Sequence, residues 1–127
     1  DNWSHPQTSG LTASESMPSL SRVPKSGNLL LIWNRARFDH RYNHSGLRTP
    51  LTCAVSTDSG RSWGNMWDLE DDPHTEFTNI GCAYTQRGEV IVTYLTSAME
   101  DPEPPGKYGR HRMSLKAAIF PVDLLGA

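Results

Sequence analysis

Short apolar runs separated by polar turns dominate the chain, and they predict strands rather than helices. The run from Leu29 to Trp33 is apolar at every position, which is typical of a central strand buried on both faces. Val90, Val92 and Tyr94 occupy alternate positions, so they are expected to share one face of a strand. The sequence shows no heptads, no strand–helix–strand alternation and no strong helix start. The pattern therefore predicts an all-β fold.

Seven strands are expected, in a group of four followed by a group of three. The first hairpin turns at residues 25–28, and a third strand at 50–55 leads through a turn into a fourth that begins at Trp63. The second group comprises strands at 77–84 and 89–95, which turn at 86–88, and a last strand at 114–120. Residues 1–14 are polar and aperiodic, with Trp3 as their only large apolar anchor. This rhythm is that of four-stranded blades.

The turn between the third and fourth strands holds four residues whose chemistry suits a locked hairpin. Asp58 can accept hydrogen bonds from backbone N–H groups a residue or two further on. Gly60 can take a positive φ without steric cost, and the hydroxyl of Ser56 can tie down the turn. Trp63 offers a large apolar plate where the chain returns.

This spacing, Ser-x-Asp-x-Gly-x-x-Trp, resembles the Asp-box of sialidases and other bacterial-neuraminidase-repeat β-propellers. In that family the box is structural and lies at the end of a blade away from the active site. Residues 15–18, 27–34, 48–52 and 77–79, with Gly88 and Tyr94, extend the resemblance over 15–120. It implies one propeller portion over 1–127, the C-terminal part of a sialidase. Two four-stranded antiparallel blades are expected, a first at 15–69 and a second, incomplete one at 77–120, after an irregular lead-in at 1–14.

The resemblance also implies roles for single residues. Sialidases hold the carboxylate of sialic acid with three arginines, because a guanidinium fork matches a carboxylate and stays charged. Arg35 resembles the second of these arginines, with Arg37 as a less favoured substitute, and Arg48 resembles the third. Glu15 resembles the glutamate that activates a tyrosine nucleophile.

Two departures from the family pattern bear on function. The stretch where the nucleophilic tyrosine is expected carries Phe77, which has no hydroxyl. The family's first arginine and its acid/base aspartate belong to earlier blades, which the chain lacks. The resemblance thus implies part of a sialidase-like glycoside hydrolase that is not catalytically competent alone. The alternative is a non-catalytic carbohydrate-binding or assembly module on the same scaffold.

The composition indicates no partner beyond the glycan or sugar acid that the resemblance implies. The net charge of −2 lacks the basic surplus of a nucleic-acid-binding protein, and no run reaches the length of a membrane span. No cofactor is expected, and no metal site, although Asp39, His40 and His44 stand close in sequence.

The cysteines and the apolar faces give two further expectations. Cys53 and Cys82 lie in strand-like runs and are expected to be buried free thiols, with a disulfide as the alternative. Two blades alone are expected to leave the face of Val90, Val92 and Tyr94 uncovered. The rest of a longer chain or a homo-oligomer is therefore expected to complete the propeller.

Overall fold

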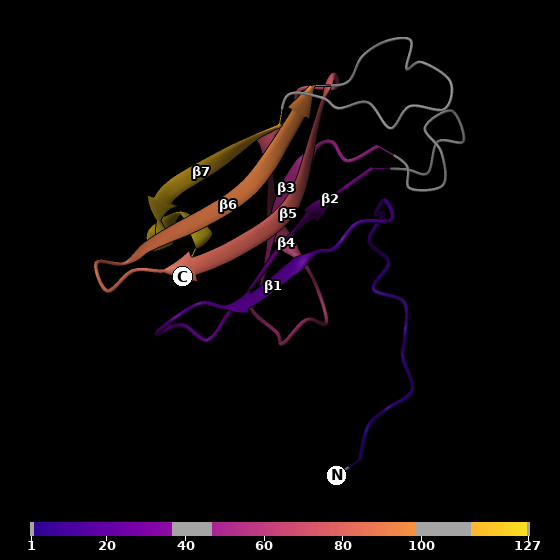
Figure 1. Cartoon of the computed structure of the whole chain (residues 1–127). Helices are drawn as coiled ribbons and strands as arrows, with labels where there is room; N and C mark the ends of the chain where they lie inside the picture. The colour runs from indigo at the N-terminus through magenta and orange to yellow at the C-terminus, as the bar shows by residue number, and fades with distance from the viewer. Residues whose placement is uncertain (1, 37–46, 99–112, 127) are drawn as a thin grey trace.

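The computed structural model describes residues 2–36, 47–98 and 113–126, and this part of the chain is all-β apart from one short 3-10 helix. The first antiparallel sheet contains β1 (Ser19–Arg22), β2 (Leu29–Asn34), β3 (Leu51–Ser56) and β4 (Gly64–Glu70) in chain order. The second contains β5 (Thr75–Tyr84), β6 (Glu89–Ala98) and β7 (Met113–Pro121), and the helix η2 (Val122–Leu125) follows it (Figure 1). The predicted all-β class is confirmed, with one sheet of four strands and one of three.

Tight turns join the strands at the two sites where glycine predicted them. Between β1 and β2, Lys25 and Gly27 take φ angles of 69° and 73°. Between β5 and β6, Gly88 takes a φ of 82°, and its backbone N–H donates to the carbonyl of Thr85 at 3.1 Å. Glycine reaches this left-handed region without steric cost, so these positions close the hairpins and fix the register of their strands.

The two sheets lie against each other (Figure 1), and the side chains between them form the hydrophobic core. Val90 and Val92 on β6 are fully buried, and Tyr94 is 2% exposed. Leu30 and Ile32 on β2 belong to the same core and are also fully buried. The expectation that Val90, Val92 and Tyr94 lie uncovered is therefore wrong, because the first sheet covers them.

A group of exposed apolar residues lies on the other face of the second sheet. Ile91 pairs with Ile119 and Leu95 pairs with Leu115, so these four residues project away from the face of Val92. Leu115 is 74% exposed and Ile119 is 60% exposed. Association with the rest of a longer chain or with a second copy stays a prediction, and this face is one exposed apolar surface available to it.

The lead-in at residues 2–14 has no regular secondary structure, as expected. Trp3 is 95% exposed, so the expectation that it anchors this stretch is wrong. The attachment comes instead from the indole N–H of Trp33, which donates to the carbonyl of Thr12 at 2.9 Å. In the residues that the structure describes, no helix is long and apolar enough to cross a membrane.

Both cysteines are free thiols, as predicted, and the alternative disulfide is not formed. Cys53 is fully buried on β3, but Cys82 on β5 is only half-buried, so the prediction of burial is right for Cys53 alone. Burial raises the pKa of Cys53 to about 12. The thiol therefore stays protonated at neutral pH and packs as a small apolar side chain.

Candidate functional site

A pocket of about 440 Å³ lies where β2 ends and the chain returns to begin β3. Residues before β1, at the end of β2, before β3 and early in β5 line it together. The lining residues are Ser14, Glu15, Ser16, Met17, Asn34, Arg48, Thr78 and Asn79. All of them except the methionine are polar or charged, so the pocket suits a polar ligand of small size.

The side-chain amide of Asn34 holds the segments of this pocket together. Asn34 is 1% exposed, and its Nδ2 donates to the carbonyls of Arg48 at 2.9 Å, Phe77 at 3.1 Å and Pro50 at 3.3 Å. Its Oδ1 accepts a hydrogen bond from the hydroxyl of Ser16 at 2.7 Å. One buried amide thus links the segments before β1, before β3 and in β5. Sequence reasoning missed this role, since an asparagine that ends an apolar run resembles an ordinary strand end.

Two of the three residues expected from the sialidase resemblance line this pocket. Glu15 is exposed, and its neighbours are fixed to the end of β2 because the Ser14 N–H donates to the Asn34 carbonyl at 3.2 Å and Ser16 bonds the amide. Arg48 is half-buried, and its backbone is held by the same amide. The structure therefore brings together a carboxylate and a guanidinium from segments more than thirty positions apart in sequence.

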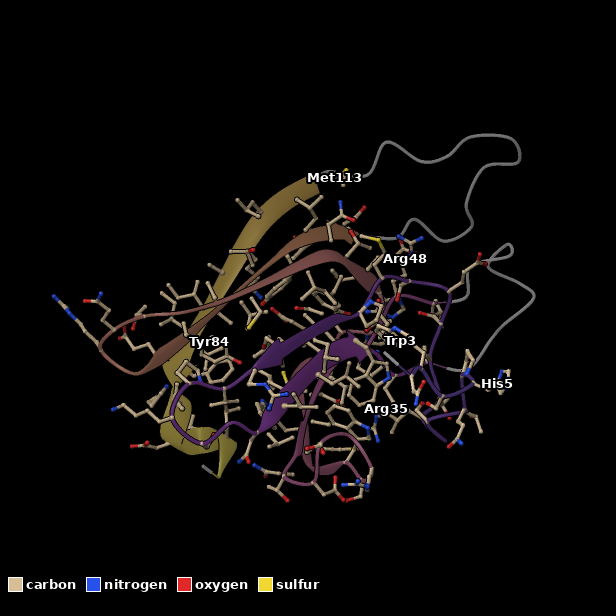
Figure 2. All side chains as sticks on the ribbon, turned by 90° about the horizontal axis from the view of Figure 1, so that it is seen from below. Trp3, His5, Arg35, Arg48, Tyr84 and Met113 are labelled. Carbon is tan, nitrogen blue, oxygen red and sulfur yellow. The ribbon has the colours of Figure 1, made fainter. Side chains whose placement is uncertain are left out.

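Arg35, the third expected residue, is not among the residues that line the pocket. It directly follows Asn34, and successive side chains of an extended chain point to opposite sides. Its guanidinium lies 3.7 Å from the carboxylate of Asp68 on β4, and its side chain is 46% exposed (Figure 2). Its suggested substitute Arg37 lies outside the described residues.

Two residues of β5 supply the side of the pocket that the sequence left undefined. Phe77 points into the core, where it is 2% exposed and packs edge to face on Tyr94 at a ring distance of 6.1 Å. The next residues, Thr78 and Asn79, line the pocket. The pairing of β5 with β6 is irregular between Thr78 and Gly81, and Asn79 takes a φ of 55° there. A glycine inside a strand-like run is the signal that could have indicated this bulge.

Neither Tyr84 on β5 nor Tyr94 on β6 offers a nucleophile to the pocket. The hydroxyl of Tyr84 pairs with the hydroxyl of Ser21 at 2.7 Å, and burial raises the pKa of Tyr84 to about 12. The hydroxyl of Tyr94 donates to the carboxylate of Glu70 at 2.5 Å, and Lys116 pairs with the same carboxylate oxygen. Burial and then this bond raise the pKa of Tyr94 above its ordinary value of 10. Both phenols therefore link the two sheets.

The Asp-box turn is closed by its own side chains. The Ser56 hydroxyl accepts from the backbone N–H of Gly60 at 2.8 Å and donates to the Asp58 carboxylate at 2.8 Å. That carboxylate also accepts from the backbone N–H of Ser62 at 2.9 Å and from its hydroxyl at 2.6 Å. The expected partner one or two residues on is thus corrected to Ser62, four residues on. Gly60 takes a φ of 87°, as the turn requires.

The turn lies at the end of β3 opposite the pocket, since β3 begins just after Arg48 and ends at Ser56 (Figure 1). Trp63, the last fixed residue, lines a separate apolar groove together with Leu31 and Trp33 on the outer face of the first sheet. The four Asp-box residues therefore have turn and packing contacts and share no lining with the pocket.

Acid is expected to weaken this turn as it protonates Asp58. Hydrogen bonds from Ser62 and Ser56 lower the pKa of Asp58 from its ordinary 3.8 to about 2. A carboxyl group whose pKa is lowered by folding stabilises the fold above its ordinary pKa and ceases to do so as the pH falls toward the lowered value. The melting temperature of the wild type should therefore fall more steeply between about pH 4 and about pH 2 than that of Asp58→Ala. Melting curves across this range, with Asp71→Ala as the exposed control, test this; parallel curves for wild type and Asp58→Ala would refute it.

Asp39, His40 and His44 lie outside the described residues. Among the residues that are described, no three His, Cys, Asp or Glu side chains lie close enough to hold a metal ion. Comparison of the chain with family models, curated proteins and solved structures finds no match.

Proposed function

We propose that the pocket of Glu15 and Arg48 binds a sugar acid, on a scaffold that is part of a sialidase-like β-propeller hydrolase. The observation that carries the proposal is the shared pocket itself. Two residues assigned from the sequence motifs alone, on distant segments, line one cavity, while the Asp-box lies at the other end of the sheet. This is the arrangement that the resemblance to sialidases implies.

The chemistry of the lining fits a small ligand that is both acidic and rich in hydroxyl groups. The guanidinium of Arg48 can form a paired contact with a carboxylate. The hydroxyl group of Thr78 and the amide of Asn79 can each donate and accept hydrogen bonds, while the Ser16 hydroxyl already donates to Asn34 and can accept from a ligand. The Glu15 carboxylate accepts only, so it would bind a ligand hydroxyl. A ligand with one acid group and several hydroxyls uses all of these groups at once.

Hydrolysis by this chain alone is not part of the proposal. Retaining cleavage through a tyrosine needs the phenol, a base that activates it and an acid for the leaving group. Glu15 could serve as the base, but no tyrosine lines the pocket within the described residues, and Phe77 is buried in the core. The same observation favours the second candidate, a non-catalytic carbohydrate-binding module. Hydrolysis of a fluorogenic aryl sialoside separates the two, because the binding module would show none even when joined to further blades.

Replacing Arg48 tests the proposed function. Free N-acetylneuraminic acid should bind the wild type weakly, and Arg48→Ala should weaken this binding by about 10- to 100-fold, the loss of a hydrogen bond to a charged group. Arg48→Lys should bind at an intermediate level, because an ammonium group keeps the charge but cannot form the fork. Isothermal titration with each variant measures the effect.

The matched control is Arg87→Ala, which removes an exposed arginine from the turn between β5 and β6 at the far end of the sheet. It should bind as the wild type does. Arg35→Ala is also expected to bind normally, because Arg35 does not line the pocket. Equal binding by the wild type and Arg48→Ala would reject the pocket as the sugar-acid site.

A further inference from the structure

Asn79 occupies an unusual backbone conformation at the edge of the pocket. Its φ of 55° lies in the left-handed region, which a non-glycine residue enters only at some energetic cost. The pairing of β5 with β6 slips between Thr78 and Gly81, so Asn79 sits in a β-bulge. A bulge bends a strand and changes the direction in which a side chain projects, and bulges are common beside binding sites.

The strand around this bulge is built to tolerate it. Gly81 follows the bulge, and a Cβ atom at that position would lie 2.7 Å from the Oγ1 of Thr93 on β6. At that distance the Thr93 side chain would have to shift to admit a Cβ atom, so a glycine suits the point where β5 comes close to β6 again. The ladder resumes at the pair of Gly81 with Thr93, so the bulge that carries Asn79 lies between two paired stretches of β5 and β6.

The side chain of Asn79 has no evident task within the part of the chain that the structure describes. It is exposed, it lines the pocket, and it makes no hydrogen bond to any other described residue. This contrasts with Asn65, the other asparagine with a positive φ, whose Nδ2 donates to the carbonyl of Leu124 at 3.3 Å. Glycine would occupy the bulge of Asn79 with less strain, so an asparagine there costs stability without an internal contact in return.

We infer that Asn79 is a ligand-recognition residue of the pocket, whose amide hydrogen-bonds a hydroxyl or N-acyl group of the bound sugar acid. The inference rests on the proposed function, since it assigns a further contact to the same pocket. Arg48 would hold the acid group. Asn79, on the β5 side, would hydrogen-bond a ring substituent that can both donate and accept hydrogen bonds. The bulge then serves to aim this amide rather than merely to end the pairing of the strands.

The test uses Asn79→Gly, because glycine relieves the positive φ and removes the amide together. Its melting temperature should equal or exceed that of the wild type, while the affinity for N-acetylneuraminic acid should fall about three- to tenfold, the loss of one neutral hydrogen bond. Asn65→Gly, the matched control distant from the pocket, should leave affinity unchanged. Asn79→Asp should bind at least as poorly as Asn79→Gly, because it removes the donor and adds a negative charge beside an acidic ligand.

The outcomes separate this inference from the proposed function. If Arg48→Ala loses binding while Asn79→Gly binds within twofold of the wild type, the pocket stands and the role of Asn79 is overturned. If Arg48→Ala and Asn79→Gly both bind as the wild type does, or the wild type does not bind the sugar acid, the proposed function fails and the role of Asn79 fails with it.

Discussion

Replacing Asn34 with alanine is expected to lower the free energy of unfolding by roughly 3–5 kcal/mol, one of the largest effects of any single polar substitution in the chain. The amide is 1% exposed and bonds three backbone carbonyls and the Ser16 hydroxyl. Removing it takes one partner from each of these groups and leaves a gap where the amide is nearly fully buried. Chemical denaturation followed by tryptophan fluorescence measures the loss.

Two further variants show whether the loss of stability in Asn34→Ala comes from the lost hydrogen bonds or from the lost side-chain volume. Asn34→Asp keeps the shape but turns an oxygen toward the carbonyls of Arg48 and Phe77, so it should destabilise at least as much as alanine. Asn28→Ala, in the turn before β2, should stay close to the wild type. A wild-type stability for Asn34→Asp would contradict the role given to this amide.

Val92→Asp is expected to prevent folding or to cost at least about 4 kcal/mol, because it places a carboxylate between the two sheets. Val92 is fully buried and belongs to the core that both sheets share. The milder Val92→Ser should lower stability by about 2–4 kcal/mol, through lost apolar burial and an unpaired hydroxyl.

The control for Val92 lies on the neighbouring strand. Ala117 on β7 is exposed and pairs with Thr93, so it projects to the opposite face of the same sheet. Ala117→Asp should fold with nearly the stability of the wild type and should reduce any self-association through the apolar face of Leu115 and Ile119. If Ala117→Asp were the more damaging variant, the assignment of inner and outer faces would be wrong.

The hydrophobic pattern predicted the strands well because the alternation of apolar and polar residues within a strand follows which of its faces is buried. The alternation of Val90, Val92 and Tyr94 correctly placed them on one face. It could not show what covers that face, since periodicity is a local property and the partner sheet lies about sixty residues earlier at Leu30 and Ile32. The prediction of an uncovered face failed for this reason.

The residues of the candidate site likewise fall into those that the sequence predicted and those that it could not. Glu15 and Arg48 were proposed from local motifs, and the fold places both on one pocket. Asn34 and Asn79 were missed because their roles depend on partners distant in sequence: the carbonyls that surround Asn34, and the pairing of Gly81 with Thr93 where the bulge of Asn79 ends. Arg35 was proposed from its position at a strand end, but the alternation of side chains directs it away from the pocket.

The central claim is that a sugar acid binds in the pocket of Glu15 and Arg48 rather than at the Asp-box or beside Arg35. Titration of the ¹⁵N-labelled chain with N-acetylneuraminic acid, followed by ¹H–¹⁵N correlation spectra, tests it most directly, because this method detects weak binding and locates it. The account predicts saturable shifts for the backbone amides of Glu15, Arg48, Thr78 and Asn79, with none at residues 56–63. Shifts centred on residues 56–63, or spectra that do not change, would contradict it.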